Sequence, residues 1–130
     1  MRKILFIGII LSLLYNPVYA WQEPFSGWFS GVKGVMTSST IATDDTTPSI
    51  SSGNVFITSA NTGATAITAF DDETVGQIIY LIGGSNTNSS TVGDSGEFNL
   101  SASFTASLDD VLILYVQAAG DFIEIGRVNN

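Results

Sequence analysis

The chain has no cysteine and no histidine among its 130 residues. Without cysteine it lacks the disulfides that stabilise many small exported domains. It also lacks the thiolates of zinc and iron–sulfur sites. Without histidine it has neither the commonest general base nor any Ser-His or Cys-His nucleophile arrangement. These absences exclude most hydrolytic and transition-metal chemistry.

Basic residues are scarce, with four Lys or Arg against 12 Asp or Glu. Two of the four, Arg2 and Lys3, precede an apolar run over residues 4–15. The segment then closes on small residues at Ala20, which is the order of a secretory signal. We predict cleavage after Ala20. The alternative is an uncleaved anchor, but the run is shorter than the about 20 apolar residues that span a bilayer.

Cleavage would leave an acidic mature chain that begins at Trp21. Only Lys33 and Arg127 then oppose all 12 acidic residues, giving a net charge of −10 over 110 residues. Nucleic acid is excluded as a partner because binding its phosphates requires clustered cations. The charge equally disfavours anionic lipid, so no membrane partner is expected after cleavage. We expect the protein in the periplasm, outside the cell or at the cell surface.

The mature chain is long enough for one domain. Residues 21–47 are predicted to form an aromatic arm and a Ser/Thr-rich linker with room for one short strand, and residues 48–130 a β domain. Exposed aromatic rings of the arm would stack on sugars or dock on a partner. Alternatively, they pack on their own domain or on a neighbouring subunit. These candidate contact residues are Trp21, Phe25, Trp28 and Phe29.

Residues from Asn54 onward predict strands separated by turns. The segments 77–82 and 111–117 are apolar on both faces, which indicates burial at a sheet interior or a subunit contact. The second of them forms a terminal hairpin with residues 122–128. The other predicted strands are 55–58, 64–70 and 98–105. No helix is expected after residue 20, so we predict an all-β fold, a small antiparallel β sandwich or β-prism-like module.

The order of strands and turns from Pro48 to Asn130 resembles the C-terminal β-rich module of tailed-phage tail fibres, tailspikes and right-handed β-helix proteins. The matching stretches are Thr47–Phe56, Ala64–Asp72, Gly76–Ile82 and Phe122–Asn130. The resemblance implies a rigid, homotrimeric cap or adhesive tip. The family usually has Asp-Gly-Thr and a tryptophan in its last hairpin, where this chain has Ala118–Asp121 and Phe122. Because phage fibres carry no export signal, residues 1–20 favour a secreted cellular protein that shares the module.

Carboxylates are the remaining route to catalysis, as an acid–base pair of the glycosidase kind. Asp71, Asp72, Glu73, Asp109 and Asp110 cluster in turn sequences, however, and this placement is typical of solvated turns. No catalytic residue is assigned, and the chain is predicted not to be an enzyme. Asp71, Asp72 and Glu73 are weak calcium candidates, because they lack the alternating spacing of a calcium loop. We therefore predict no cofactor, with calcium as the alternative.

The resemblance and the doubly apolar strands predict an exported, non-enzymatic module with a structural or adhesive role. It is expected to self-associate, as a homotrimer, like a fibre tip or a β-helix capping domain. One alternative is a monomeric glycan-binding domain that recognises a surface glycan. A second is a component of a phage tail fibre.

Overall fold

The computed structural model describes residues 36–130, which form a compact unit from Met36 to Asn130. The predicted signal at residues 1–20 and the aromatic residues Trp21, Phe25, Trp28 and Phe29 lie outside the described residues. The described chain contains strands and turns but no helix, which confirms the all-β prediction. Over the same range, no helix has the length and apolar character needed to cross a membrane.

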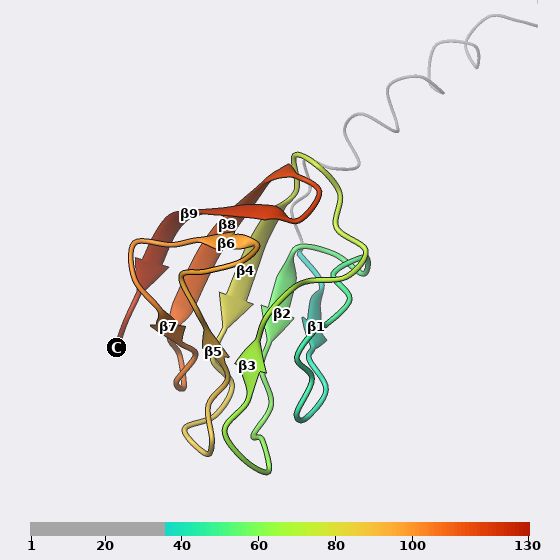
Figure 1. Ribbon diagram of the computed structural model, residues 1–130. Helices are drawn as coiled ribbons and strands as arrows, with labels where there is room; N and C mark the ends of the chain where they lie inside the picture. The colour runs from blue at the N-terminus through green and yellow to red at the C-terminus, as the bar shows by residue number, and fades with distance from the viewer. Residues whose placement is uncertain (1–35) are drawn as a thin grey trace, which may run out of the picture. The chain divides into compact units, whose positions relative to one another are not determined.

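Nine short strands of the described chain form two sheets. The strands are β1 Ser38–Thr40, β2 Val55–Ile57, β3 Ala66–Ile67, β4 Ile78–Ile82, β5 Thr91–Val92, β6 Phe98–Asn99, β7 Phe104–Thr105, β8 Val111–Ala118 and β9 Asp121–Val128. The larger sheet has the order β1-β2-β4-β8-β9-β6, and the smaller has the order β3-β5-β7. In Figure 1 the smaller sheet lies in front of the larger one.

The N-terminal half of the larger sheet is parallel. Strands β1, β2 and β4 run side by side in one direction, with Ser39, Phe56 and Leu81 in one row. Parallel neighbours need long connections. The connection from β2 to β4 passes through the smaller sheet as β3, where Ala66 lies beside Thr91 of β5. The sheets are therefore mixed, whereas the sequence predicted antiparallel pairing. Hydrophobic alternation reports which face is buried and contains no information on strand direction.

The C-terminal half is antiparallel and confirms the predicted hairpin. Strand β8 pairs with β4 on one side and with β9 on the other. The chain reverses at Gly120, whose φ of 67° lies in the left-handed region that glycine adopts without steric cost. Strand β6 then adds to β9 in parallel and closes that edge of the sheet.

The core lies between the two sheets. The larger sheet contributes Phe56, Ile79, Leu81, Leu112, Leu114, Val116 and Phe122, and the smaller contributes Ile67, Val92 and Phe104. Phe70, Phe98 and Phe122 form an aromatic cluster with ring centroids 5.3–5.4 Å apart. Two of these ring pairs are edge-on, a geometry worth about 1 kcal/mol per pair beyond the area buried.

Two strand predictions need correction. The strand predicted over 64–70 is reduced to β3, and the strand predicted over 98–105 divides into β6 and β7, which belong to different sheets. Phe98, Leu100 and Phe104 are buried as the alternation predicts, but Ala102 is exposed in the segment where the chain changes sheets. The predicted linker contains the one short strand its composition allowed, β1, and also the buried Ile41.

Candidate functional site

The larger sheet has a second apolar face, directed away from the core. In β4, Ile79 and Leu81 are buried in the core, so Ile78, Tyr80 and Ile82 point to the other side. Strand β8 repeats the pattern. The doubly apolar strands predicted from the sequence thus have one face in the core and one on the surface of the described chain.

The strand register aligns the outward side chains in three rows across the sheet. One row is Ile57, Ile82, Val111 and Val128; the next is Val55, Tyr80 and Ile113; the third is Ile78, Tyr115 and Ile123. We call these ten residues the outer face. None of them is charged. Ile78, Tyr115 and Val128 are 39%, 37% and 49% exposed, so the face remains open to solvent over the described residues.

A shallow groove lies beside β3, the edge strand of the smaller sheet. Its volume is about 450 Å³, and its lining is Asp44, Thr46, Thr62, Gly63, Ala64, Thr65, Ala66 and Thr68. Four of these residues are threonines, and no aromatic residue contributes. The groove can therefore hold a ligand mainly by hydrogen bonds.

Asp44 is the charged residue of this groove. Its Oδ1 accepts a hydrogen bond of 2.9 Å from the Thr62 amide and one of 3.3 Å from the Thr65 hydroxyl, and its Oδ2 accepts one from the Thr62 hydroxyl. These donors, led by the Thr62 hydroxyl, hold the pKa of the Asp44 carboxyl below its usual range. Asp44 thus stays ionised at neutral pH.

The buried Asn61 fixes the wall of the groove. Its Oδ1 accepts a hydrogen bond of 2.8 Å from the Asp44 amide, and its Nδ2 donates to the Asn88 carbonyl at 2.8 Å and to the Ser90 hydroxyl at 3.0 Å. One amide side chain thereby joins three successive passes of the chain. Because a buried amide without these partners would be costly, Asn61 holds the turns in a fixed stack.

The three calcium candidates contact protein groups on two different segments, at Ser49 and at Gly120. Asp71 forms a backbone bridge with Ser49, and Asp72 accepts a hydrogen bond of 2.7 Å from the Ser49 hydroxyl. Glu73 accepts one of 3.0 Å from the Gly120 amide. Among residues 36–130, no three acidic side chains are placed so that they could hold a metal ion.

The other turn carboxylates also have structural contacts. Asp72 and Asp109 have φ angles of 62° and 68°, a backbone that Asp tolerates better than most residues. Asp110 is buried and accepts a hydrogen bond of 2.6 Å from the Asn130 amide. Asp72 and Asp109 are therefore exposed turn residues, as the sequence indicated. Asp110 is a correction, because it is buried instead of solvated and its contact is with the C-terminal residue.

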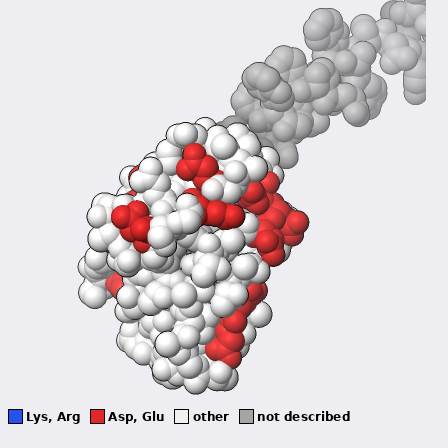
Figure 2. Space-filling model, in the orientation of Figure 1, with Lys and Arg blue, Asp and Glu red and all other residues white. Residues whose placement is uncertain are grey.

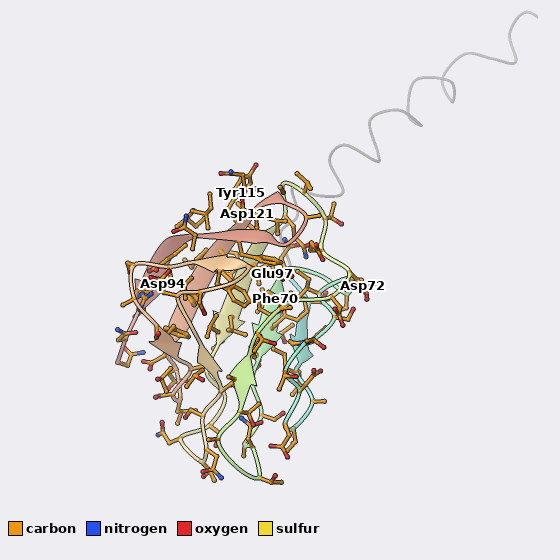
Figure 3. All side chains as sticks on the ribbon, in the orientation of Figure 1. Phe70, Asp72, Asp94, Glu97, Tyr115 and Asp121 are labelled. Carbon is orange, nitrogen blue, oxygen red and sulfur yellow. The ribbon has the colours of Figure 1, made fainter. Side chains whose placement is uncertain are left out.

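Glu97 is a residue that the sequence did not single out. Its carboxylate lies against Gly120, and its buried Oε2 has no hydrogen-bond partner within the described chain. Figure 3 labels Glu97, which comes just before β6, and Asp72, which follows β3. Glu97 and Glu73 both reach the hairpin turn, so the position of the turn depends on both side chains.

Charge is unevenly distributed over the described surface. Figure 2 shows several separate acidic patches and no basic side chain on the face that it draws. Arg127 is the single Lys or Arg in residues 36–130, and it is paired with Glu124. The surface outside the uncharged outer face is therefore predominantly acidic.

No family model, curated protein or solved structure matches this chain. The outer face and the groove beside β3 are therefore the two features of the described chain that bear on its function. The doubly apolar strands 77–82 and 111–117 pointed to the outer face in the sequence. The groove beside β3 was not predicted from the sequence. Its only sequence signal is the run of Thr and small residues over 62–68, which is equally typical of a plain polar strand.

Proposed function

We propose that the chain is an exported, non-enzymatic module with a structural or adhesive role, which self-associates through the outer face as a closed homotrimer. The proposal rests on the composition of that face. Ten side chains, all uncharged and nearly all aliphatic, are aligned in rows across four neighbouring strands. Contiguous exposed apolar surface of this kind marks interaction sites in soluble proteins. The resemblance to fibre-tip modules supports the trimeric state.

Charge favours a second copy of the chain as the occupant of the outer face. The mature chain would have a net charge of −10, so most pairs of surfaces from two copies would bring carboxylates together. The outer face has no ionised side chain. Two copies can therefore meet there and remove apolar surface from water without juxtaposing like charges.

The size of the face favours a closed assembly over a simple pair. Three strands with about 17 Å of outward-facing length and the shorter β2 with about 10 Å, spaced about 4.8 Å apart, give a projected area of roughly 290 Å². A stable two-protein contact usually buries about 800 Å² on each partner. Pairing through the face alone would be weak, but a closed ring of three subunits gives every subunit two contacts, which reinforce each other.

Replacing Ile113 with glutamate is expected to convert the assembly to monomers, because the buried carboxylate would have no partner in the interface. The measurement is the solution mass of residues 21–130 by light scattering coupled to gel filtration. Thr105→Glu is the matched control, since Thr105 is exposed on the smaller sheet and receives the same charge. It should keep the wild-type mass.

Tyr115→Glu provides a second variant on the outer face, at a position already 37% exposed, in case Ile113→Glu fails to fold. Circular dichroism establishes folding in each sample. If both folded outer-face variants keep the wild-type mass, the proposed interface is wrong.

A monomeric glycan-binding domain is the second candidate function. The observation that favours it is the hydroxyl-lined groove at Asp44 and β3, which belongs to the other sheet. A wild-type protein that stays monomeric and binds a sugar at this groove would replace the first proposal with this one.

A further inference from the structure

The groove beside β3 is a gap between two passes of the chain. The Thr91 amide donates a hydrogen bond of 2.9 Å to the Thr65 carbonyl, so the peptide groups of Ala66, the next residue, point away from β5. At the end of the gap, the Thr68 amide donates one of 2.9 Å to the Thr46 carbonyl. Within the described chain no strand lies beside β3 on this side, which leaves the Ala66 N–H and C=O facing the groove.

The side chains of the groove present mainly acceptors. The Thr62 hydroxyl donates its proton to Asp44, and the Thr68 hydroxyl donates its proton to the Thr46 carbonyl. The Thr65 hydroxyl lies 3.3 Å from both Asp44 Oδ1 and the Gly63 carbonyl oxygen and uses its proton on one of the two. A hydroxyl that has donated its proton can still accept through its lone pairs. The Asp44 carboxylate accepts hydrogen bonds from the Thr62 amide and hydroxyl and from the Thr65 hydroxyl, and the Gly63 amide is a further, weaker donor, so a ligand would replace one of these groups at Asp44.

This chemistry selects among ligands. The ionised Asp44 and its neighbour Asp45 disfavour phosphate, sulfate and carboxylate groups. The absence of an aromatic lining disfavours a mainly apolar ligand. An extended peptide could pair with only two residues of β3, so it would gain few backbone hydrogen bonds. Sugar hydroxyls, by contrast, donate to acceptors and also accept from the Ala66 amide.

We propose that this groove binds a neutral glycan, with the Asp44 carboxylate, the Thr hydroxyls and the Ala66 peptide groups as its direct contacts. The inference gives a location and a ligand class to the adhesive part of the proposed function. The groove and the outer face belong to different sheets, so self-association leaves the groove accessible. A trimer would present three grooves, and multivalency would compensate for weak single-site binding.

The test is a titration of uniformly ¹⁵N-labelled residues 21–130 with methyl glycosides of glucose, galactose, mannose and N-acetylglucosamine, followed by amide chemical shifts. At least one glycoside should shift the amides of residues 44–46 and 62–68 with millimolar affinity. Ala66→Arg, which fills the groove from an exposed position, should weaken that binding by about tenfold or more. Thr105→Arg, on β7 at the other edge of the smaller sheet, adds the same charge and should bind like the wild type.

The absence of localised shifts with all four glycosides would overturn the proposal. So would equal or tighter binding of the methyl glycoside of N-acetylneuraminic acid, or binding only of an extended Ser/Thr peptide at these amides. The solution mass of each sample is measured in parallel. Ala66→Arg should leave the mass unchanged, so loss of glycan binding can be separated from failure of self-association.

Discussion

Replacing Gly83 with alanine is expected to destabilise the fold by about 3 kcal/mol or more. A Cβ at this position would lie 1.6 Å from the Ser107 carbonyl oxygen and 2.7 Å from the Ala106 carbonyl carbon. Both atoms belong to the backbone, so no side-chain rotation relieves the overlap. The Gly83 amide also donates a hydrogen bond of 2.8 Å to the Asp110 carbonyl, which prevents the segment from moving aside without further loss.

The measurement is urea unfolding of residues 21–130, with wild type and variants at one protein concentration. Gly63→Ala is the matched control, since a Cβ at Gly63 would meet no atom within 4 Å. It should change the free energy of unfolding by less than about 0.5 kcal/mol. Equal stability of Gly83→Ala and Gly63→Ala would contradict the close approach of residues 83 and 107.

Replacing Arg127 with methionine is expected to lower the free energy of unfolding by about 2 kcal/mol at neutral pH. Its Nε donates to Glu124 Oε1 at 2.6 Å, and its Nη2 donates to Glu124 Oε2 and to the Ala102 carbonyl, both at 2.7 Å. Its guanidinium carbon lies 5.6 Å from the centroid of the Phe104 ring. One side chain therefore ties β9 of the larger sheet to the segment that enters the smaller one.

This contribution should depend on pH in a defined direction. The Arg127 guanidinium, together with the Ser101 amide and hydroxyl, lowers the pKa of Glu124 from 4.5 to about 2. A carboxyl whose pKa is lower in the folded state stabilises that state above the unfolded pKa, and the stabilisation is lost as the pH falls toward the folded value. The contribution of the pair is thus complete above pH 4.5 and disappears toward about pH 2.

The check is the difference in unfolding free energy between wild type and Arg127→Met, measured from about pH 6 down to about pH 2. The difference should shrink over this interval. Arg127→Lys, which keeps the charge but loses the paired hydrogen bonds, should give an intermediate value. A difference that stays constant with pH would contradict the assigned role of the Glu124 carboxylate.

The sequence predicted the parts of the fold that depend on local pattern. The hairpin of β8 and β9 can be recognised in the sequence because its two apolar segments flank a turn that contains glycine. The parallel stack of β1, β2 and β4 is not visible, since pairing between residues such as Ser38 and Val55 is a long-range choice with no local signature. The division of 98–105 between two sheets was missed for the same reason.

The candidate surfaces were predictable to different extents. The doubly apolar strands 77–82 and 111–117 predicted burial at a sheet interior or a subunit contact, so the outer face has a signal in the sequence. The close backbone approach at Gly83 and Gly84 has no signal in the sequence, because the residues that approach them, Ser107 and Thr58, are far away along the chain. The groove forms where Asp44 contacts Thr62 and Thr65. These residues are about 20 positions apart along the chain, so the sequence alone does not show that they are neighbours.

The most direct test of the central claim is the solution mass of residues 21–130, by light scattering coupled to gel filtration over a range of protein concentrations. The measurement is repeated with calcium and with a chelator, since calcium is the one cofactor that the sequence left open. Self-association through the outer face predicts a stable trimer, whose mass falls to that of a monomer in Ile113→Glu. A wild-type protein that remains monomeric at every concentration, with and without calcium, would contradict it.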